Sequence, residues 1–275
     1  MLALSITLAM SWITSHRSTV VLAVGLVCCV ASLAVAQRRF SYRWDQNREN
    51  IPYDGRFTFA RVRYRHAPGG NWAGGMPSWM HGYPLAEQNL MRIMKEVSLL
   101  DVHGDDINVV TLDDSELFRY PIAYIIEVGW WTMTDAEVEG LRAYLLKGGF
   151  LIVDDFKPSG WRGIPGGGWE PFRDNIARLF PDARLVDLDP TVPIFNSFFQ
   201  IRTLDDFPQA YNSGRPQFRG IFEDNDRSKR LMMMVNYNTD VSQYWEWSGR
   251  GLRPFDDTNE AYKLGVNYLI YGMTH

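Results

Sequence analysis

The sequence predicts an α/β domain in which helices cover both faces of a mainly parallel β-sheet. Near-continuous apolar segments such as residues 122–128 are typical of strands that are buried on both faces. Residues 134–155 follow the order of a βαβ unit, with a capped helix, a glycine stop and a buried strand. With 46% hydrophobic and 22% charged residues, the 275-residue chain can bury a large core, which excludes intrinsic disorder.

The elements are predicted in order along the chain. Residues 57–64 alternate as a strand does, a Gly/Trp-rich loop covers residues 68–82, and a helix begins near Pro84. Further strands are predicted at residues 108–112, 122–128, 150–155, 184–188 and 229–236. Further helices are predicted from the capping box Thr134–Glu137, over residues 170–180, and from Asp257 to the end. Residues 223–227 are predicted to form a tight turn between two strands.

The charge and cysteine content exclude several classes of function. Lys and Arg number 28 against 32 Asp and Glu, a net charge of −4, and no basic stripe is present, so nucleic acid is not expected as a partner. Both cysteines, Cys28 and Cys29, fall in the N-terminal apolar segment. A chain that begins at Gln37 would therefore contain no disulfide, no Cys-ligated zinc and no cysteine nucleophile.

The N-terminal segment predicts export. Residues 19–36 are apolar, follow His16 and Arg17, and end in Ala34-Val35-Ala36, as in a signal peptide with its cleavage site. An uncleaved membrane anchor is the alternative, because about 17 apolar residues is the lower limit for spanning a bilayer. We therefore expect a signal peptide or anchor over residues 1–36, a linker or arm over 37–56, and a single domain over 57–275. The expected location is the periplasm, free or membrane-anchored, with membrane contact only through an uncleaved N-terminal segment.

Several phrases of the sequence together resemble a known bacterial family. They include the strand FARVRY, the helix YPLAEQNLMRIMKEVS, the junction LRAYLLKGGFLIVDDF and the segment NYNTDVSQYWEW. In this order they resemble domain of unknown function 4159, across nearly all of residues 57–273. The resemblance implies a flavodoxin-like three-layer sandwich of the class I glutamine-amidotransferase-like group, but no established activity. Enzymes of that group use a cysteine on a strand-to-helix turn, which a chain beginning at Gln37 lacks, and no Gly-x-Ser-x-Gly replaces it.

Candidate catalytic residues lie where strands end, because ligands of open α/β sheets bind at the carboxyl ends of the strands. Asp154 and Asp155 end the strand at 150–155, and carboxylates there can serve as acid and base. Adjacent strand residues point to opposite faces, so the two act together only if a twist or bulge intervenes. The alternative is that one of them caps the following loop or pairs with Arg162 or Arg173.

Histidines and aromatic residues supply the other candidates. His66 and His81 flank the Gly/Trp-rich loop, but no compact metal-binding spacing accompanies them, so no metal and no cofactor are expected. Six of the ten tryptophans, Trp72 and Trp79 among them, are predicted in or near loops, where they suit sugar stacking or an interface. Asn236 and Asp240 follow a strand and are candidate polar contacts to a ligand. Packing of long loops is the alternative role of these tryptophans.

Two functions fit these features. The absent nucleophile and the tryptophans in loops favour a non-catalytic binding or scaffold module of the bacterial cell envelope, whose partner is an envelope protein or saccharide. The alternative is a hydrolase acting on an envelope polysaccharide or peptide, with Asp154 or Asp155 and a histidine. The hydrolase predicts His66 or His81 within hydrogen-bond reach of an acid, whereas the binding module predicts a shallow aromatic surface.

Overall fold

A computed structural model describes residues 49–72, 75–156, 168–205, 207–211 and 214–275. The chain divides into two compact units, Met1–Arg48 and Glu49–His275, and the second is described below. The predicted signal peptide or anchor and residues 37–48 of the predicted linker lie outside the described residues.

A seven-stranded sheet with the order β3-β1-β4-β6-β9-β8-β7 forms the centre of the domain. The pairs from β3 to β9 are parallel, whereas β8 and β7 add to the edge in antiparallel orientation. The strands are β1 (Phe57–Val62), β3 (Val102–Val110), β4 (Ile122–Ile126), β6 (Phe150–Phe156), β7 (Val186–Asp187), β8 (Gln217–Phe222) and β9 (Leu231–Tyr237). A separate small sheet pairs β2 (Arg65–His66) with β5 (Trp131–Thr132). The predicted mixed α/β fold is confirmed, and it is consistent with a flavodoxin-like sandwich.

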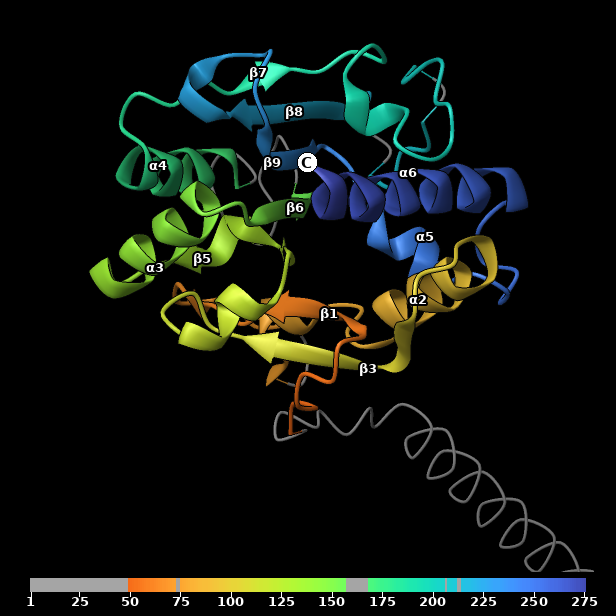
Figure 1. Cartoon of the computed structure of the whole chain (residues 1–275), viewed down its shortest axis with the longest axis horizontal. Coiled ribbons are helices and arrows are strands. Elements are labelled where there is room, and N and C mark those ends of the chain that lie inside the picture. The colour runs from red at the N-terminus through yellow and green to blue at the C-terminus, as the bar shows by residue number, and fades with distance from the viewer. Residues whose placement is uncertain (1–48, 73–74, 157–167, 206, 212–213) are drawn as a thin grey trace, which may run out of the picture. The chain divides into compact units, whose positions relative to one another are not determined.

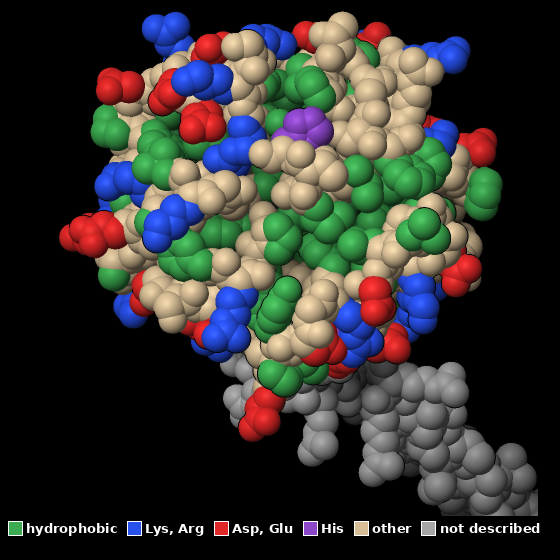
Figure 2. Space-filling view, in the orientation of Figure 1, with side chains coloured by type: hydrophobic (Ala, Val, Ile, Leu, Met, Phe, Trp, Pro, Cys, Tyr) green, Lys and Arg blue, Asp and Glu red, His purple; other side chains and the backbone are tan. Residues whose placement is uncertain are grey.

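Helices cover both faces of the sheet (Figure 1). One group consists of α2 (Leu85–Val97), α5 (Ser242–Glu246) and α6 (Phe255–Thr274), which contact one another. The other group, α3 (Asp135–Leu146) and α4 (Trp169–Leu179), lies on the opposite side in Figure 1. On the face shown in Figure 2, hydrophobic side chains gather over α6 and charged side chains lie mainly around the margin. None of the described helices is long and apolar enough to span a bilayer.

Local sequence explains most of these elements. All five residues of β4 are buried, as expected for a central strand between two helical layers. The predicted capping box of α3 is present, since Thr134 Oγ1 accepts a hydrogen bond from the Glu137 amide and Glu137 Oε2 accepts one from the Thr134 amide.

Other elements differ from the prediction. The strand expected at 108–112 begins at Val102, and the terminal helix begins at Phe255 after Pro254 rather than at Asp257. The strand implied before the turn at residues 223–227 had no predicted bounds; it is β8, which lies between β9 and the edge strand β7. The turn expected between two strands is confirmed: Glu223–Asn225 joins β8 to β9. Trp169 and Trp245 lie in helices rather than in loops, and Trp245 is almost fully buried against α6.

Three strand ends at the carboxyl edge of the sheet carry a left-handed backbone. Glu127 after β4, Asp155 in β6 and Asn238 after β9 have φ angles of 53°, 55° and 57°. This conformation costs a residue other than glycine about 1–2 kcal/mol, and such residues concentrate at functional sites. The carboxyl edge of the sheet therefore has the backbone features of a functional site.

Candidate functional site

Four side chains meet at the carboxyl edge and form what we call the acid–imidazole cluster: His81, Glu127, Asp155 and Asp240. His81 Nδ1 lies 2.9 Å from Asp155 Oδ2 and 3.3 Å from Glu127 Oε1. His81 follows the 3-10 turn Ser78–Met80, and Asp240 lies between β9 and α5. Strand ends and loops that are distant in the sequence thus place three carboxylates around one imidazole.

A backbone irregularity in β6 places Asp155 in this cluster. The register between β6 and β9 shifts between Val153 and Phe156, and Asp155 itself is left-handed. A twist or bulge was the predicted condition for Asp154 and Asp155 to act together, but here it separates them: Asp155 joins the cluster and Asp154 is bonded within the framework. The Asp155 carbonyl then accepts a hydrogen bond from the Glu127 amide at 3.1 Å, which ties the ends of β4 and β6 together.

Asp154 serves the framework beneath the cluster. It is fully buried and accepts hydrogen bonds from Tyr124 Oη (2.7 Å), Asn236 Nδ2 (3.2 Å), and the amides of Val241 (3.2 Å) and Ser242 (3.0 Å). These four donors come from β4, β9 and the start of α5. Asp154 therefore joins two strands to a helix. Of its two predicted alternative partners, Arg173 contacts Asp174 instead and Arg162 lies outside the described residues.

Burial dominates the electrostatics of the carboxylates. Burial and the neighbouring charge of Asp155 raise the pKa of Asp240 to about 7, and burial with the charge of Asp240 raises the pKa of Asp154 to about 7. Burial and Glu127 also raise the pKa of Asp155. Burial disfavours a charged imidazole, yet the hydrogen bonds with Asp155 and Glu127 raise the pKa of His81 well above its usual value. Clustered groups of this kind characterise functional sites.

Aromatic side chains border the cluster. The Trp72 ring stacks on the His81 ring with centroids 4.6 Å apart, and Trp72 Nε1 donates to Glu127 Oε1 at 3.1 Å. The Tyr211 hydroxyl hydrogen-bonds to Asp155 Oδ1. The imidazole is therefore held by an aromatic face as well as by two carboxylates.

A buried ion pair supports the backbone that carries His81. Arg61 and Glu87 form a salt bridge with no exposed surface. The Arg61 guanidinium also donates to the carbonyls of Trp79 (3.1 Å) and His81 (3.4 Å). Strand β1 and helix α2 thereby fix the turn from which the imidazole projects.

The other candidates from the sequence lie outside the acid–imidazole cluster. His66 is in β2 opposite Trp131, with its imidazole near the carbonyl of Ala67. Trp79 is buried beside Tyr83 instead of lying exposed in a loop. Asn236 is fully buried and bridges Asp154 to Tyr268, so both polar ends of its side chain are engaged inside the protein.

Sequence reasoning missed Glu127 and Tyr211. Glu127 directly follows a buried strand, so the rule that selected Asp154 and Asp155 would have found it had that strand been ended at Ile126. No local pattern points to Tyr211, which reaches Asp155 from a segment 56 residues away in sequence.

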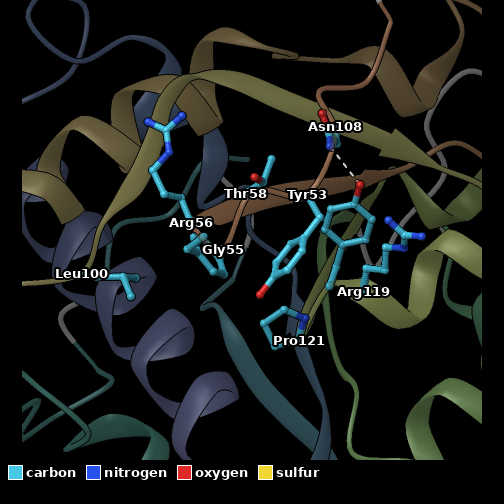
Figure 3. Close-up of a pocket in the computed structure, with 10 residues that line it drawn as sticks. Tyr53, Gly55, Arg56, Thr58, Leu100, Asn108, Arg119 and Pro121 are labelled. Atoms are coloured by element: carbon cyan, nitrogen blue, oxygen red, sulfur yellow. Dashed lines mark hydrogen bonds between the residues drawn. The ribbon is translucent and has the colours of Figure 1, made fainter.

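A groove and a cavity lie elsewhere on the described surface. The groove, of about 510 Å³, is lined by Arg63, Tyr64, Arg65, His66, Pro77, Trp79, Thr111, Asp113 and Glu137. Tyr64 connects it to the cluster, since its hydroxyl donates to the Glu127 carbonyl at 2.9 Å. The cavity, of about 220 Å³, lies at the opposite edge of the sheet between Tyr53, Arg119 and Pro121 (Figure 3).

Comparison with known proteins places the chain in a family. No curated protein matches it. The family model described as "Domain of unknown function (DUF4159)" matches residues 58–273, which spans every strand and helix described above except the first residue of β1 and the last residue of α6. The chain therefore belongs to the DUF4159 family of domains of unknown function.

Proposed function

We propose that this domain is a hydrolase of the bacterial cell envelope, in which the acid–imidazole cluster activates a water molecule. The observation that carries the proposal is the 2.9 Å contact between His81 Nδ1 and Asp155 Oδ2. An imidazole oriented by a carboxylate through one ring nitrogen presents the other nitrogen for proton transfer. A histidine within hydrogen-bond reach of an acid is also what the hydrolase requires and the binding module does not.

The second nitrogen of His81 is available for chemistry. Among the described residues, Nε2 has no hydrogen-bond partner, whereas Nδ1 contacts two carboxylates. The His81 side chain is 20% exposed, so water and substrate can reach it. Asp155 and Glu127 are much more deeply buried and act as orienting groups.

The surroundings favour a polysaccharide or peptide as substrate. Trp72 adds an aromatic face at the cluster, and such faces stack on sugar rings and peptide side chains. The groove lined by Tyr64, whose hydroxyl donates to the Glu127 backbone carbonyl, carries both arginine and carboxylate side chains, which suits a polar chain. The proposed envelope location comes from the apolar leader of the sequence.

A non-catalytic module is the second candidate, and the buried aromatic residues argue against it. Trp79 and Trp245 lie in the core, so fewer tryptophans are left to form a binding surface than the sequence suggested. A binding module also has no need of three buried carboxylates around an imidazole, which is costly to maintain.

The test is hydrolysis by the purified full-length protein. Peptidoglycan fragments, envelope polysaccharides and acetylated or peptide-linked model substrates are incubated with it, and products are identified by mass spectrometry. We expect His81→Gln and Asp155→Asn to lower the rate by about 10²–10⁴-fold, as for loss of an acid–base group. His66→Gln is the matched control and should retain the wild-type rate.

Two outcomes would overturn the proposal. The first is an equal loss of rate in His66→Gln and His81→Gln, because it would show that the cluster is not the reacting site. The second is the absence of any product while the folded protein binds one of these polymers, a result that would establish the binding module instead.

A further inference from the structure

The acid–imidazole cluster and Asp154 bring together four buried carboxyl groups. Glu127, Asp154, Asp155 and Asp240 are each at most 9% exposed. Among the described residues, no lysine or arginine forms an ion pair with any of them, and His81 is their one cationic neighbour. Buried carboxylates are stable in the ionised form when they are paired or bound to a metal ion, so a bound cation would stabilise this set.

The hydrogen bonds show which carboxylates lack partners. Asp154 is satisfied by four donors, and both oxygens of Asp155 are engaged by His81 and Tyr211. Asp240 differs, because Oδ1 accepts from Ser242 Oγ and the Gln243 amide, each at 2.8 Å, whereas Oδ2 has no donor in the described part of the chain. The residue as a whole is only 1% exposed.

Glu127 repeats this arrangement. Its Oε1 contacts Trp72 Nε1 and His81 Nδ1, and its Oε2 has no partner among the residues that the structure describes. The side chain is nine-tenths buried. Asp240 Oδ2, Glu127 Oε2 and His81 Nε2 thus have no hydrogen-bond partner among the described residues.

From this geometry we propose that His81, Asp155 and Asp240 bind one divalent transition-metal ion, of the zinc or manganese class. One ligand atom from each lies within 4.8 Å of the others. An imidazole nitrogen with two carboxylate oxygens suits Zn²⁺ or Mn²⁺, whereas Ca²⁺ and Mg²⁺ prefer oxygen alone. Three protein ligands also leave a coordination position open, as in catalytic sites.

The metal rests on the proposed function and changes the roles within it: with the ion bound, His81 and Asp155 would be ligands, and Glu127 would accept the proton in place of His81. The ion would supply an acidified bound water, and Glu127 would accept its proton as the water oxygen adds to the scissile carbon of the substrate. As the bond to the leaving group breaks, Glu127 would return that proton to the leaving group. This assignment gives the unpartnered Oε2 of Glu127 a role and requires no further reactant.

The compact motif sought in the sequence is absent because the ligands come from different elements. His81 and Asp155 are 74 residues apart, and Asp240 follows another strand. The expectation of no metal rested on the absence of a short ligand motif in the sequence. Parallel strands bring together residues that are distant in the sequence, so ligands at strand ends show no such motif.

Metal binding is tested without substrate on the full-length protein. The protein is stripped with a chelator and titrated separately with Zn²⁺, Mn²⁺, Mg²⁺ and Ca²⁺ by calorimetry. We expect one site for Zn²⁺ or Mn²⁺ and at least tenfold weaker binding in His81→Gln and Asp240→Asn. His103→Gln is the matched control, because His103 lies 3.1 Å from Asp54 in a histidine–aspartate pair outside the cluster.

A measurement on the wild-type protein keeps the test independent of variant folding. Pulsed electron paramagnetic resonance of the Mn²⁺-loaded protein should detect one coordinated imidazole nitrogen. The absence of a stoichiometric site, or equal weakening by His103→Gln and His81→Gln, would refute the metal. Hydrolysis that continues unchanged in the stripped protein would refute the role of the metal in the reaction but leave the proposed hydrolase standing. Metal binding without any hydrolysis would support the metal site but refute the hydrolase.

Discussion

The two edges of the sheet are built in different ways. The carboxyl edge gathers buried carboxylates, an imidazole and three left-handed residues. The amino edge consists mainly of packed apolar side chains and of ion pairs exposed to solvent, such as Arg56–Asp54 and Arg119–Glu116. In the amino-edge cavity Asn108 donates to the Tyr120 hydroxyl at 2.8 Å, so its polar groups are satisfied locally (Figure 3). One edge gathers buried carboxyl groups around an imidazole, and the other pairs its charged groups at the surface.

The largest expected effect is the loss of stability when a buried carboxylate, rather than an exposed one, is removed. Asp154→Ala removes the acceptor of four hydrogen bonds, and leaving those donors unpaired should lower the free energy of unfolding by roughly 3–5 kcal/mol. Urea denaturation followed by circular dichroism measures the change. Asp54→Ala, at the amino edge, is the control and should leave the midpoint unchanged, because this carboxylate is exposed. Similar losses in both variants would remove the distinction between the edges.

The second expected effect is a pH dependence of stability in the metal-free protein. Burial raises the pKa of Asp154 and of Asp240 to about 7, so the folded state binds protons more tightly than the unfolded chain does. The contribution to stability is therefore complete below pH 4 and is lost as the pH rises through 7. The melting temperature of the stripped protein should fall by about 4 °C or more between pH 5.5 and 8.

Asp240→Asn provides the control for this titration. The facing groups are His81, Asp154 and Asp155, together with the hydroxyls of Tyr124 and Tyr211. A neutral asparagine removes both the cost of burying the Asp240 charge and its repulsion of Asp154. The melting temperature should therefore fall by a clearly smaller amount between pH 5.5 and 8. A melting temperature that rises from pH 5.5 to 8 in the wild-type protein would contradict the assigned pKa directions.

The smallest effect tests packing at the amino edge. A Cβ added at Gly272 in α6 would lie 2.7 Å from Ile122 Cγ1 and 2.8 Å from Phe150 Cδ1, which side chains do not tolerate without moving. Gly272→Ala should therefore lower the free energy of unfolding by about 1 kcal/mol, overpacking outweighing the better helix propensity of alanine. Gly104→Ala in β3 is the control, since nothing lies within 4 Å of its added Cβ. Metal affinity and hydrolysis should be unchanged in both variants, and a change in either would connect the amino edge to the site.

Individual residues show how far the sequence alone could reach. The capping box at Thr134 and the buried strands β4 and β6 were predicted, because propensity and hydrophobic pattern act over a few residues. The hydrolase alternative predicted His66 or His81 within reach of an acid, but nothing in the chain predicted that His81 rather than His66 meets Asp155 beside Asp240. Glu127 was missed because the predicted strand extended to residue 128, whereas the observed strand β4 ends at Ile126. Trp79 was assigned to a ligand surface, although its large apolar ring is satisfied by burial in the core.

The sequence by itself determined the alternation of strands and helices, and from it a layered fold whose strands end in acidic residues. Those features depend on hydrogen bonds and apolar spacing within single elements. Only the tertiary structure decided that Asp155 turns away from Asp154 and meets His81, 74 residues earlier in the chain, beside Asp240. The reason is physical: a left-handed residue at a strand end is held in place by the parallel neighbours on either side, and no local pattern records them.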